Sequence, residues 1–405
     1  MPKITRLKNG GVTAPRGFSA SGIHSGIKQP PSRDLALLVS EIQGPIAGMF
    51  TTNQIVAAPV VFDRLNLKKK VGRAIIINSG NANVFTGPQG LRDTQEMAAL
   101  IAKVLHTPRH TVFVASTGVI CPPLPMPAIR KGIPRLIRSL SPEGNRAAAQ
   151  AIMTTDTTVK EVALQSRIGG KMVTVGGMAK GAGMIHPNMA TMLAFLTTDV
   201  AIRQPMLQTV LRRAVNRTFN CISVDGETST NDTVLCLANG MVKNALWGRD
   251  SPDLGAFQDL LHEACLSLAM QICRDGEGAT KLVDIQVTGA RNTGDAKQIA
   301  TSLATSPLLK TALFGEDPNW GRILAAIGRA GPRIQADRLE IAFNGIYVVK
   351  RGKGVPPPVE KKVKRVMQKS AFTIRVNLGA GGGSWKIWTT DLTYDYVRIN
   401  ASYRS

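Results

Sequence analysis

Thr191 is the residue of this chain whose position best suits a hydroxyl nucleophile that cuts its own backbone. It follows a segment broken by Gly181, Gly183 and Pro187, and residues 191–200 read as a buried strand. If the Thr191 hydroxyl attacks the carbonyl carbon of Ala190, the peptide bond becomes an ester, and hydrolysis leaves Thr191 with a free α-amine. That amine can act as the base for its own hydroxyl. A threonine that merely opens a strand is the alternative, because β-branched residues are common there.

A second polar segment could supply the hydrogen-bond donors that acyl transfer needs. An acyl-transfer enzyme requires a nucleophile, a base, and donors aimed at the developing oxyanion. Thr117 and Gly118 follow a strand-like run at residues 111–115, and a glycine lets a backbone N–H group approach a substrate closely. Seen alone, this Ser-Thr-Gly sequence equally fits an ordinary turn at the end of a strand.

Both segments belong to an ordered series of motifs that spans nearly the whole chain. The series resembles the ornithine acetyltransferase family, the bifunctional glutamate N-acetyltransferase/amino-acid acetyltransferases of arginine biosynthesis. The segment around Thr191 resembles the autoprocessing site of that family. The other matching segments are residues 10–17, 50–53, 78–83, 115–120, 154–156, 225–232, 275–281, 316–322 and 396–400. Any one of them is weak evidence, whereas the ordered set is specific.

The resemblance implies an α+β fold, a layered α-β-β-α sandwich with the nucleophile at the first residue of a central strand. Hydrophobic periodicity by itself indicates only a mixture of helices and strands. The resemblance also implies self-cleavage between Ala190 and Thr191. The products would be an α chain, residues 1–190, that carries the oxyanion hole, and a β chain, residues 191–405, that begins with the nucleophile and ends in the substrate site. Two of each would form an α2β2 assembly.

For the site, the resemblance implies that the Thr117 hydroxyl and the Gly118 amide form the oxyanion hole and that Thr191 is the catalytic nucleophile. The substrate-binding residues that it implies are Thr154, Lys180, Thr191, Glu277, Asn400 and Ser405. Asn319 is a further expected contact. The chain departs from the family pattern at Cys121, where glycine is usual, and a left-handed backbone conformation would strain a cysteine.

The residue types agree with these roles. Lys180, in the glycine-rich segment before the nucleophile, can bind a substrate carboxylate as a point charge, although most lysines are solvated surface residues. Glu277 lies between two glycines, where a core residue is not expected, and it can meet an ammonium group or assist proton transfer. For the last residues, Tyr396 to Ser405, a frayed tail is the alternative to a terminus that folds into the site.

The implied activity is transfer of the acetyl group from N2-acetylornithine to glutamate, which yields ornithine and N-acetylglutamate. Acetyl-CoA as a second acetyl donor stays open, because bifunctional members of the family use it. No other cofactor and no metal are expected. An amidase or aminopeptidase that uses an N-terminal threonine on a related fold is the alternative enzyme. The two enzymes differ in whether an amine or water takes the acyl group.

The composition indicates a protein with a large core. The chain has 405 residues, of which 43% are hydrophobic and 19% charged, which is enough for two domains. The first residues lack the apolar stretch of a signal peptide, and no segment is long and apolar enough to span a bilayer. The five cysteines lack C-x-x-C spacing and are predicted to be small buried residues in a reducing compartment. We therefore expect a cytoplasmic enzyme.

The net charge of +23 is not explained by the family resemblance. A strongly basic domain is typical of a nucleic-acid binder, so a non-catalytic basic binding protein is a third interpretation. However, only 5% of the residues are aromatic, and they are not interleaved with the basic runs as a single-strand binding platform requires. A positive field that attracts anionic metabolites is the simpler explanation, and solubility at an unusual ionic balance is another.

Strand-like runs and stretches with helical periodicity are mixed along the chain, without internal repeats. The predicted strands are residues 35–40, 74–78, 111–115, 171–175, 191–200 and 339–343. The predicted helices are residues 91–105, 144–153, 205–218, 253–273 and 359–367. The glycine run at residues 379–383 is predicted to be a hairpin loop between strands at 372–378 and 385–390.

Overall fold

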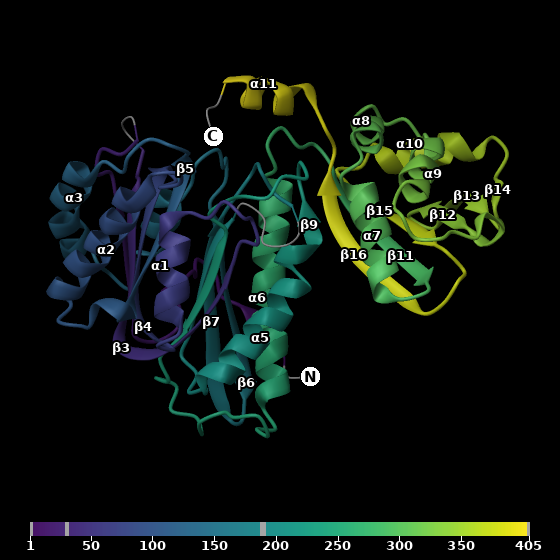
Figure 1. Ribbon diagram of the computed structural model, residues 1–405. Coiled ribbons are helices and arrows are strands. Elements are labelled where there is room, and N and C mark those ends of the chain that lie inside the picture. The colour runs from purple at the N-terminus through teal and green to yellow at the C-terminus, as the bar shows by residue number, and fades with distance from the viewer. Residues whose placement is uncertain (1–2, 29–31, 187–191, 403–405) are drawn as a thin grey trace.

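Two β-sheets, each packed against helices, make up the computed structural model of the protein, which describes residues 3–28, 32–186 and 192–402 (Figure 1). The strands of the first sheet are β1 (Ile4–Arg6), β2 (Phe18–Ile23), β3 (Leu35–Phe50), β4 (Val71–Asn81), β5 (Val112–Val119), β6 (Lys160–Ile168), β7 (Lys171–Lys180), β8 (Leu193–Thr198) and β10 (Thr233–Ala238). The helices packed with it are α1 (Ala58–Leu67), α2 (Gly87–Val104), α3 (Met126–Arg138), α4 (Asn145–Ala151), α5 (Gln204–Asn216) and α6 (Leu254–Arg274). Among the described residues, no helix is long and apolar enough to cross a membrane.

The first sheet has two halves, one with β2, β4 and β5 and the other with β1, β6, β7, β8 and β10. The long strand β3 belongs to both. Its residues 35–40 pair with β2 and β4, whereas its residues 46–50 pair with β10. The pairing with β4 shifts register between Val39 and Gly44, and an irregularity of this kind bends a strand. Gly44 has no room for a side chain, because a Cβ atom there would lie 1.9 Å from the carbonyl oxygen of Ala238. The strand order β1-β6-β7-β8-β10-β3-β4-β5 therefore passes through β3 from one half to the other.

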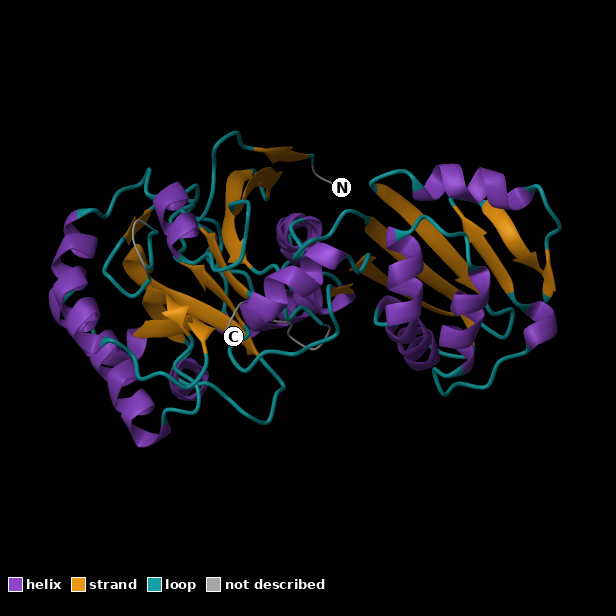
Figure 2. Cartoon of the chain, turned by 90° about the horizontal axis from the view of Figure 1, so that it is seen from above, coloured by secondary structure: helices purple, strands orange, loops and turns teal. Residues whose placement is uncertain are grey.

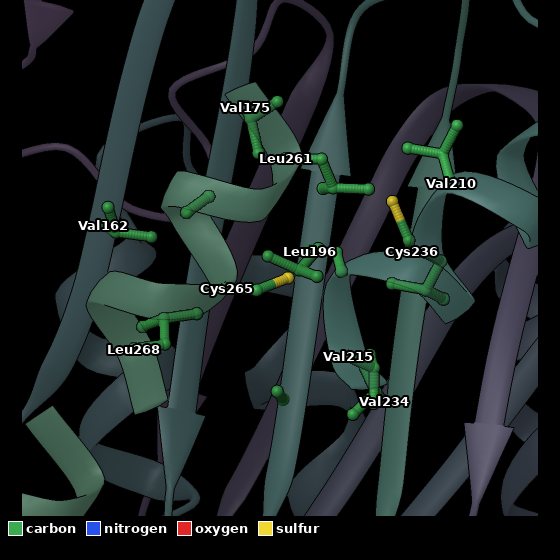
Figure 3. Close-up of a cluster of buried hydrophobic side chains, with 14 of the residues drawn as sticks. Val162, Val175, Leu196, Val210, Val215, Val234, Cys236, Leu261, Cys265 and Leu268 are labelled. Carbon is green, nitrogen blue, oxygen red and sulfur yellow. The ribbon is translucent and has the colours of Figure 1, made fainter. Parts of the chain in front are cut away.

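The buried clusters show that the two halves stack as two β layers. Side chains of a strand point alternately to opposite faces, and on one face Leu38 and Phe113 share a cluster with Phe195 and Leu235 of the other half. On the opposite faces, the half with β4 and β5 packs on α1, α2 and α3. The half with β6, β7, β8 and β10 packs on α5 and α6 (Figure 3). The layers follow the order helix, sheet, sheet, helix, so the predicted α-β-β-α sandwich is confirmed. Strand β8 lies between β7 and β10.

The second sheet, with the order β14-β13-β12-β15-β11-β16-β9, forms a layered unit beside the sandwich (Figure 2). Its strands are β9 (Ile222–Ser223), β11 (Leu282–Ala290), β12 (Glu340–Phe343), β13 (Ile346–Lys350), β14 (Lys353–Gly354), β15 (Ala371–Asn377) and β16 (Gly383–Thr390). The remaining helices are α7 (Thr293–Ala304), α8 (Pro307–Phe314), α9 (Trp320–Gly328), α10 (Val359–Met367) and α11 (Tyr394–Ser402). One buried cluster joins Ile285 and Ile374 of this sheet to Ile299 of α7, Ile323 of α9 and Val363 of α10. The second unit thus has a hydrophobic core of its own.

The predicted hairpin around the glycine run is wrong. Strands β15 and β16 do not pair with each other, because β11 lies between them, parallel to β15 and antiparallel to β16. The loop that joins them crosses the end of β11, where the amide of Ala380 donates to the carbonyl of Gly289 at 2.7 Å. A Cβ atom on Gly381 would lie 2.7 Å from the carbonyl oxygen of Ala290. The glycines therefore permit a close crossing over a third strand, which a local sequence pattern does not reveal.

The predicted helices are confirmed as α2, α4, α5, α6 and α10, with small differences at most of their ends. The predicted strand at residues 35–40 is only the first part of β3. The cysteine prediction is confirmed for Cys221, Cys236, Cys265 and Cys273, which are buried, and is wrong for Cys121, which is exposed. Cys121 lies in the turn after β5, outside both sheets, so its side chain is not packed between a sheet and a helix.

Candidate active site

A cavity of about 350 Å³ is lined by residues of the sandwich and of α11. Helix α11 extends over one end of the sandwich (Figure 1). Tyr396 and Asn400 of α11 line the cavity, so the C-terminal segment folds onto it as far as Asn400 and is not a frayed tail there. Six of the predicted catalytic and substrate-binding residues line this one cavity: Thr117, Gly118, Thr154, Lys180, Glu277 and Asn400. They come from β5, the loop after α4, β7, the turn after α6, and α11.

Thr117 and Gly118 lie near the end of β5, opposite the end of β4. Gly118 has a φ of 133°, and a Cβ atom there would lie 2.3 Å from the backbone carbon of Gly80. Only glycine fits such a position. The sequence predicts a close approach of substrate at this glycine, and in the structure Gly118 also permits the close approach of the β4 backbone. The Thr117 side chain is buried and faces Lys180.

Lys180 is the last residue of β7 and is buried, so the expectation that it lies in the following glycine-rich loop is wrong. Its ammonium nitrogen donates to the Thr154 hydroxyl at 2.7 Å and to the Thr117 hydroxyl at 3.5 Å. Burial lowers the pKa of Lys180, while the charge of Asp156 opposes that effect. The cavity therefore has a cationic wall that is held by the end of a strand.

Asp156 lies behind that wall and received no role in the sequence analysis. One carboxylate oxygen accepts from the Lys160 ammonium at 2.6 Å and from the Gly181 amide at 2.7 Å. The other accepts from the Thr154 amide at 2.9 Å and lies 4.0 Å from the Lys180 nitrogen. Burial alone would raise the pKa of Asp156, but the two lysines and the Gly181 amide lower it to about 2. Its place in the Thr-Thr-Asp motif was the only signal in the sequence.

A second wall of the cavity is acidic, with Asp225, Glu227 and Glu277 in its lining. The Asn400 amide donates to a Glu277 carboxylate oxygen at 2.8 Å, and the Glu277 backbone N–H donates to the carbonyl of Ala182 at 2.9 Å. The Tyr396 hydroxyl contacts a carboxylate oxygen of Asp225 at 3.3 Å. Burial raises the pKa of Asp225, and the nearby charge of Glu277 raises it further. Glu277, in the turn after α6, and Asn400, on α11, thus meet at the cavity although they lie far apart in the sequence.

The segment at residues 225–232, which the sequence singled out only as one of the matching motifs, supplies part of the cavity wall. Its lining residues are Asp225, Glu227, Ser229, Thr230 and Asn231. Asn319, the further contact expected from the resemblance, is not among the residues that line this cavity. It is exposed and precedes α9 in the second unit. In the same motif, residues 316–322, Glu316 forms an ion pair with Lys281 at 2.8 Å, and neither residue is part of the cavity lining.

Three predicted residues, Ala190, Thr191 and Ser405, lie outside the described residues. The nucleophile, the cleavage point and the last substrate contact therefore stay predictions. Before this segment, the described residue Met184 lines the cavity. After it, the Met192 amide donates to an Asp232 carboxylate oxygen at 3.0 Å.

The turn after Thr117 and Gly118 has the left-handed backbone conformation that strains a cysteine. Cys121 has a φ of 83°, in the left-handed region that its Cβ atom disfavours. Its amide donates to the carbonyl of Val84 at 3.2 Å, which fixes the turn. The described residues include no group of three or more His, Cys, Asp and Glu side chains that could hold a metal ion.

Comparisons with known proteins show the family to which this chain belongs. The sequence profile of the ArgJ family matches residues 19–405. The chain is similar to an arginine biosynthesis bifunctional protein ArgJ from Synechococcus sp., with 46% identity over 98% of this chain and 97% of the relative. A protein of the same name from Geobacter sulfurreducens is 46% identical over 96% of this chain and 99% of the relative. A crystal structure of ArgJ from Bacillus halodurans has 42% identity over 47% of this chain and 100% of that chain, with a TM-score of 0.44. By its sequence matches over nearly its whole length, this chain is a member of the ArgJ family.

Proposed function

We propose that this protein is a glutamate N-acetyltransferase that moves the acetyl group from N2-acetylornithine to glutamate in arginine biosynthesis. One observation carries the proposal: six residues expected from widely separated motifs line a single cavity. The relatives that cover nearly the whole chain are named as arginine biosynthesis bifunctional proteins. We expect the enzyme to act in the cytoplasm.

The two walls of the cavity suit an α-amino acid. The Lys180 ammonium and the Thr154 hydroxyl, 2.7 Å apart, would bind a substrate carboxylate. Glu277, held by the Asn400 amide at 2.8 Å, would bind an ammonium group. Donor and acceptor share the amino-acid carboxylate, so the same cationic wall would serve both in turn.

In the proposed mechanism, the Thr191 hydroxyl attacks the acetyl carbonyl of the donor while its own α-amine takes the proton. The Thr117 hydroxyl and the Gly118 amide stabilise the oxyanion that forms. The C–N bond then breaks, the α-amine returns the proton to the leaving nitrogen, and ornithine departs from an acetyl ester of Thr191. Glutamate attacks this ester through its neutral α-amine, and the reverse proton transfers release N-acetylglutamate and free Thr191.

The free α-amine of Thr191 requires cleavage after Ala190. Strand β7, before the cut, and strand β10, after it, both pair with β8. The two chains would consequently remain in one sheet, and two copies of each would make the α2β2 assembly that we expect. Acetyl-CoA is the co-substrate that we propose to test as a second donor, because the relatives are named bifunctional.

The test measures ornithine release from N2-acetylornithine with and without glutamate. A transferase should release ornithine continuously only when glutamate is present and should form N-acetylglutamate in equal amount. Equal rates without glutamate, with free acetate as product, would identify an amidase and refute the transferase. Acetyl-CoA with glutamate, without acetylornithine, tests the second donor separately.

A further inference from the structure

A buried row of alternating charges runs from the cationic wall of the cavity to Asp275, two residues before Glu277. It runs from Lys180 to Asp156, from Asp156 to Lys160, and from Lys160 to Asp275. The side chains of Lys160 and Asp156 are fully buried, and that of Asp275 is 5% exposed. Buried charges of this kind persist when they are paired and hydrogen-bonded. No part of the proposed acetyl transfer assigns a role to the members of this row beyond Lys180.

Asp156 is the branch point of the row. Besides the two lysines, it accepts hydrogen bonds from the backbone amides of Thr154 and Gly181. These amides belong to the two segments that supply the cationic wall, so Asp156 sets the spacing of the Thr154 hydroxyl and the Lys180 ammonium. At the far end of the row, Asp275 accepts from the backbone amides of Thr157 and Thr158 and lies two residues before Glu277.

We propose that Asp156 is a positioning residue for acetyl transfer, which holds Lys180 charged and in place for the substrate carboxylate and, through Lys160 and Asp275, ties it to the turn that carries Glu277. The inference rests on the proposed function of the same cavity. It assigns to Asp156 an effect on the charge of Lys180 that a purely structural aspartate would not have.

The charged groups around Lys180 set the direction of the expected effect. They are Lys28, Asp156, Lys160, Asp232 and Glu277. Burial lowers the pKa of Lys180 most, and Lys160 lowers it as well, whereas Asp156, Glu277 and Asp232 raise it. Removing the charge of Asp156 should thus let Lys180 lose its proton at a lower pH. Removing the charge of Lys160 should move that loss to a higher pH.

The experiment follows kcat/KM for N2-acetylornithine in the presence of saturating glutamate, from about pH 6 to about pH 10. Asp156→Asn should move the alkaline limb of the profile to lower pH by roughly 1–3 units, the usual effect of an opposite charge at this separation. Lys160→Met should move the limb in the opposite direction. At a pH above the new limb, Asp156→Asn should raise KM more than it lowers kcat, since carboxylate binding is lost.

Asp199→Asn is the matched control. Asp199 is buried and accepts a hydrogen bond from the Thr174 amide at 3.0 Å. Thr174 lies on β7, the strand that ends with Lys180, but nearer the other end of that strand. Its variant should keep the wild-type limb even if the protein is less stable. A limb in Asp156→Asn that coincides with that of the wild type, or one that Asp199→Asn shifts equally, would overturn the proposal.

Asp156→Glu covers the case in which the neutral variant does not fold. It keeps the carboxylate, so the alkaline limb should stay near that of the wild type. The longer side chain should displace the Thr154 and Gly181 amides that Asp156 holds, and kcat/KM should fall for that reason. A limb in Asp156→Glu shifted down by a full unit or more would contradict the charge argument. Wild-type enzyme that transfers no acetyl group would instead refute the proposed function, a result distinct from an unshifted limb.

Discussion

Replacing Thr117 by valine removes one proposed oxyanion donor with little change in shape. Both side chains are β-branched, and β-branched residues favour the strand conformation that position 117 has in β5. In the wild type, the Thr117 hydroxyl that the substitution removes accepts a hydrogen bond from the Lys180 ammonium at 3.5 Å. Lys180 keeps the Thr154 hydroxyl at 2.7 Å and the Asp156 carboxylate at 4.0 Å. The substitution therefore leaves no buried charge without a partner.

The expected loss is catalytic and not structural. Removing one donor from an oxyanion hole costs roughly 10²–10³ in kcat, about 2.7–4 kcal/mol of transition-state stabilisation. The long contact to Lys180 contributes at most about 1 kcal/mol to the free energy of unfolding. Thr117→Ser keeps the hydroxyl and should retain kcat within roughly tenfold, which is less than the cost of a lost donor.

The assay measures kcat for ornithine release with both substrates saturating, alongside the thermal unfolding midpoint. The kinetics are compared only for protein whose cleavage after Ala190 has been verified by mass spectrometry, because the same donors would serve self-cleavage. A Thr117→Val enzyme with wild-type kcat would clear Thr117 of the role. A kcat loss in Thr117→Ser as large as that in Thr117→Val would show that shape, and not the donor, accounts for the effect.

Four further predictions follow from the same structure. Wild-type protein should separate in denaturant into two fragments of which the second begins with Thr191, and Thr191→Ala should stay a single chain; N-terminal sequencing that finds another cut would refute the amine-base mechanism. Initial rates should give parallel double-reciprocal lines, with an acetyl adduct on the Thr191 peptide when glutamate is withheld, whereas intersecting lines without an adduct would indicate direct transfer. If the net charge of +23 steers anionic substrates, kcat/KM for glutamate should fall with added salt while kcat changes little; tight, salt-resistant binding of DNA or RNA would favour the nucleic-acid interpretation. Because the pKa of Asp156 is depressed to about 2, its contribution to stability is present above its unfolded pKa and is lost as the pH falls toward 2. Acid titration of the unfolding free energy should therefore show a drop, from about pH 4 to about pH 2, that is larger by about 2 kcal/mol in the wild type than in Asp156→Asn; equal drops would contradict this pairing.

The sequence by itself identified six residues that the structure brings to one cavity. Thr117, Gly118, Thr154, Lys180, Glu277 and Asn400 were identified from ordered motifs, and all of them line one cavity. Local patterns also sufficed for α10, whose bounds equal the predicted ones, because the spacing of Val359, Val363 and Val366 forms a single apolar stripe. In these cases, the signal lies within a short stretch of chain.

Only the tertiary structure decided how these segments surround one another. Lys180 is buried at a strand end because β7 continues to that residue and pairs with β8, which a glycine after it in the sequence does not reveal. Asp156 is a branch point because Lys160, Thr154 and Lys180 converge on it from three segments. The hairpin prediction was wrong for the same physical reason, since β11, far away in the sequence, pairs with both β15 and β16. Pairing partners and buried charges depend on contacts between distant segments, and the burial that sets their energies exists only after the layers have packed.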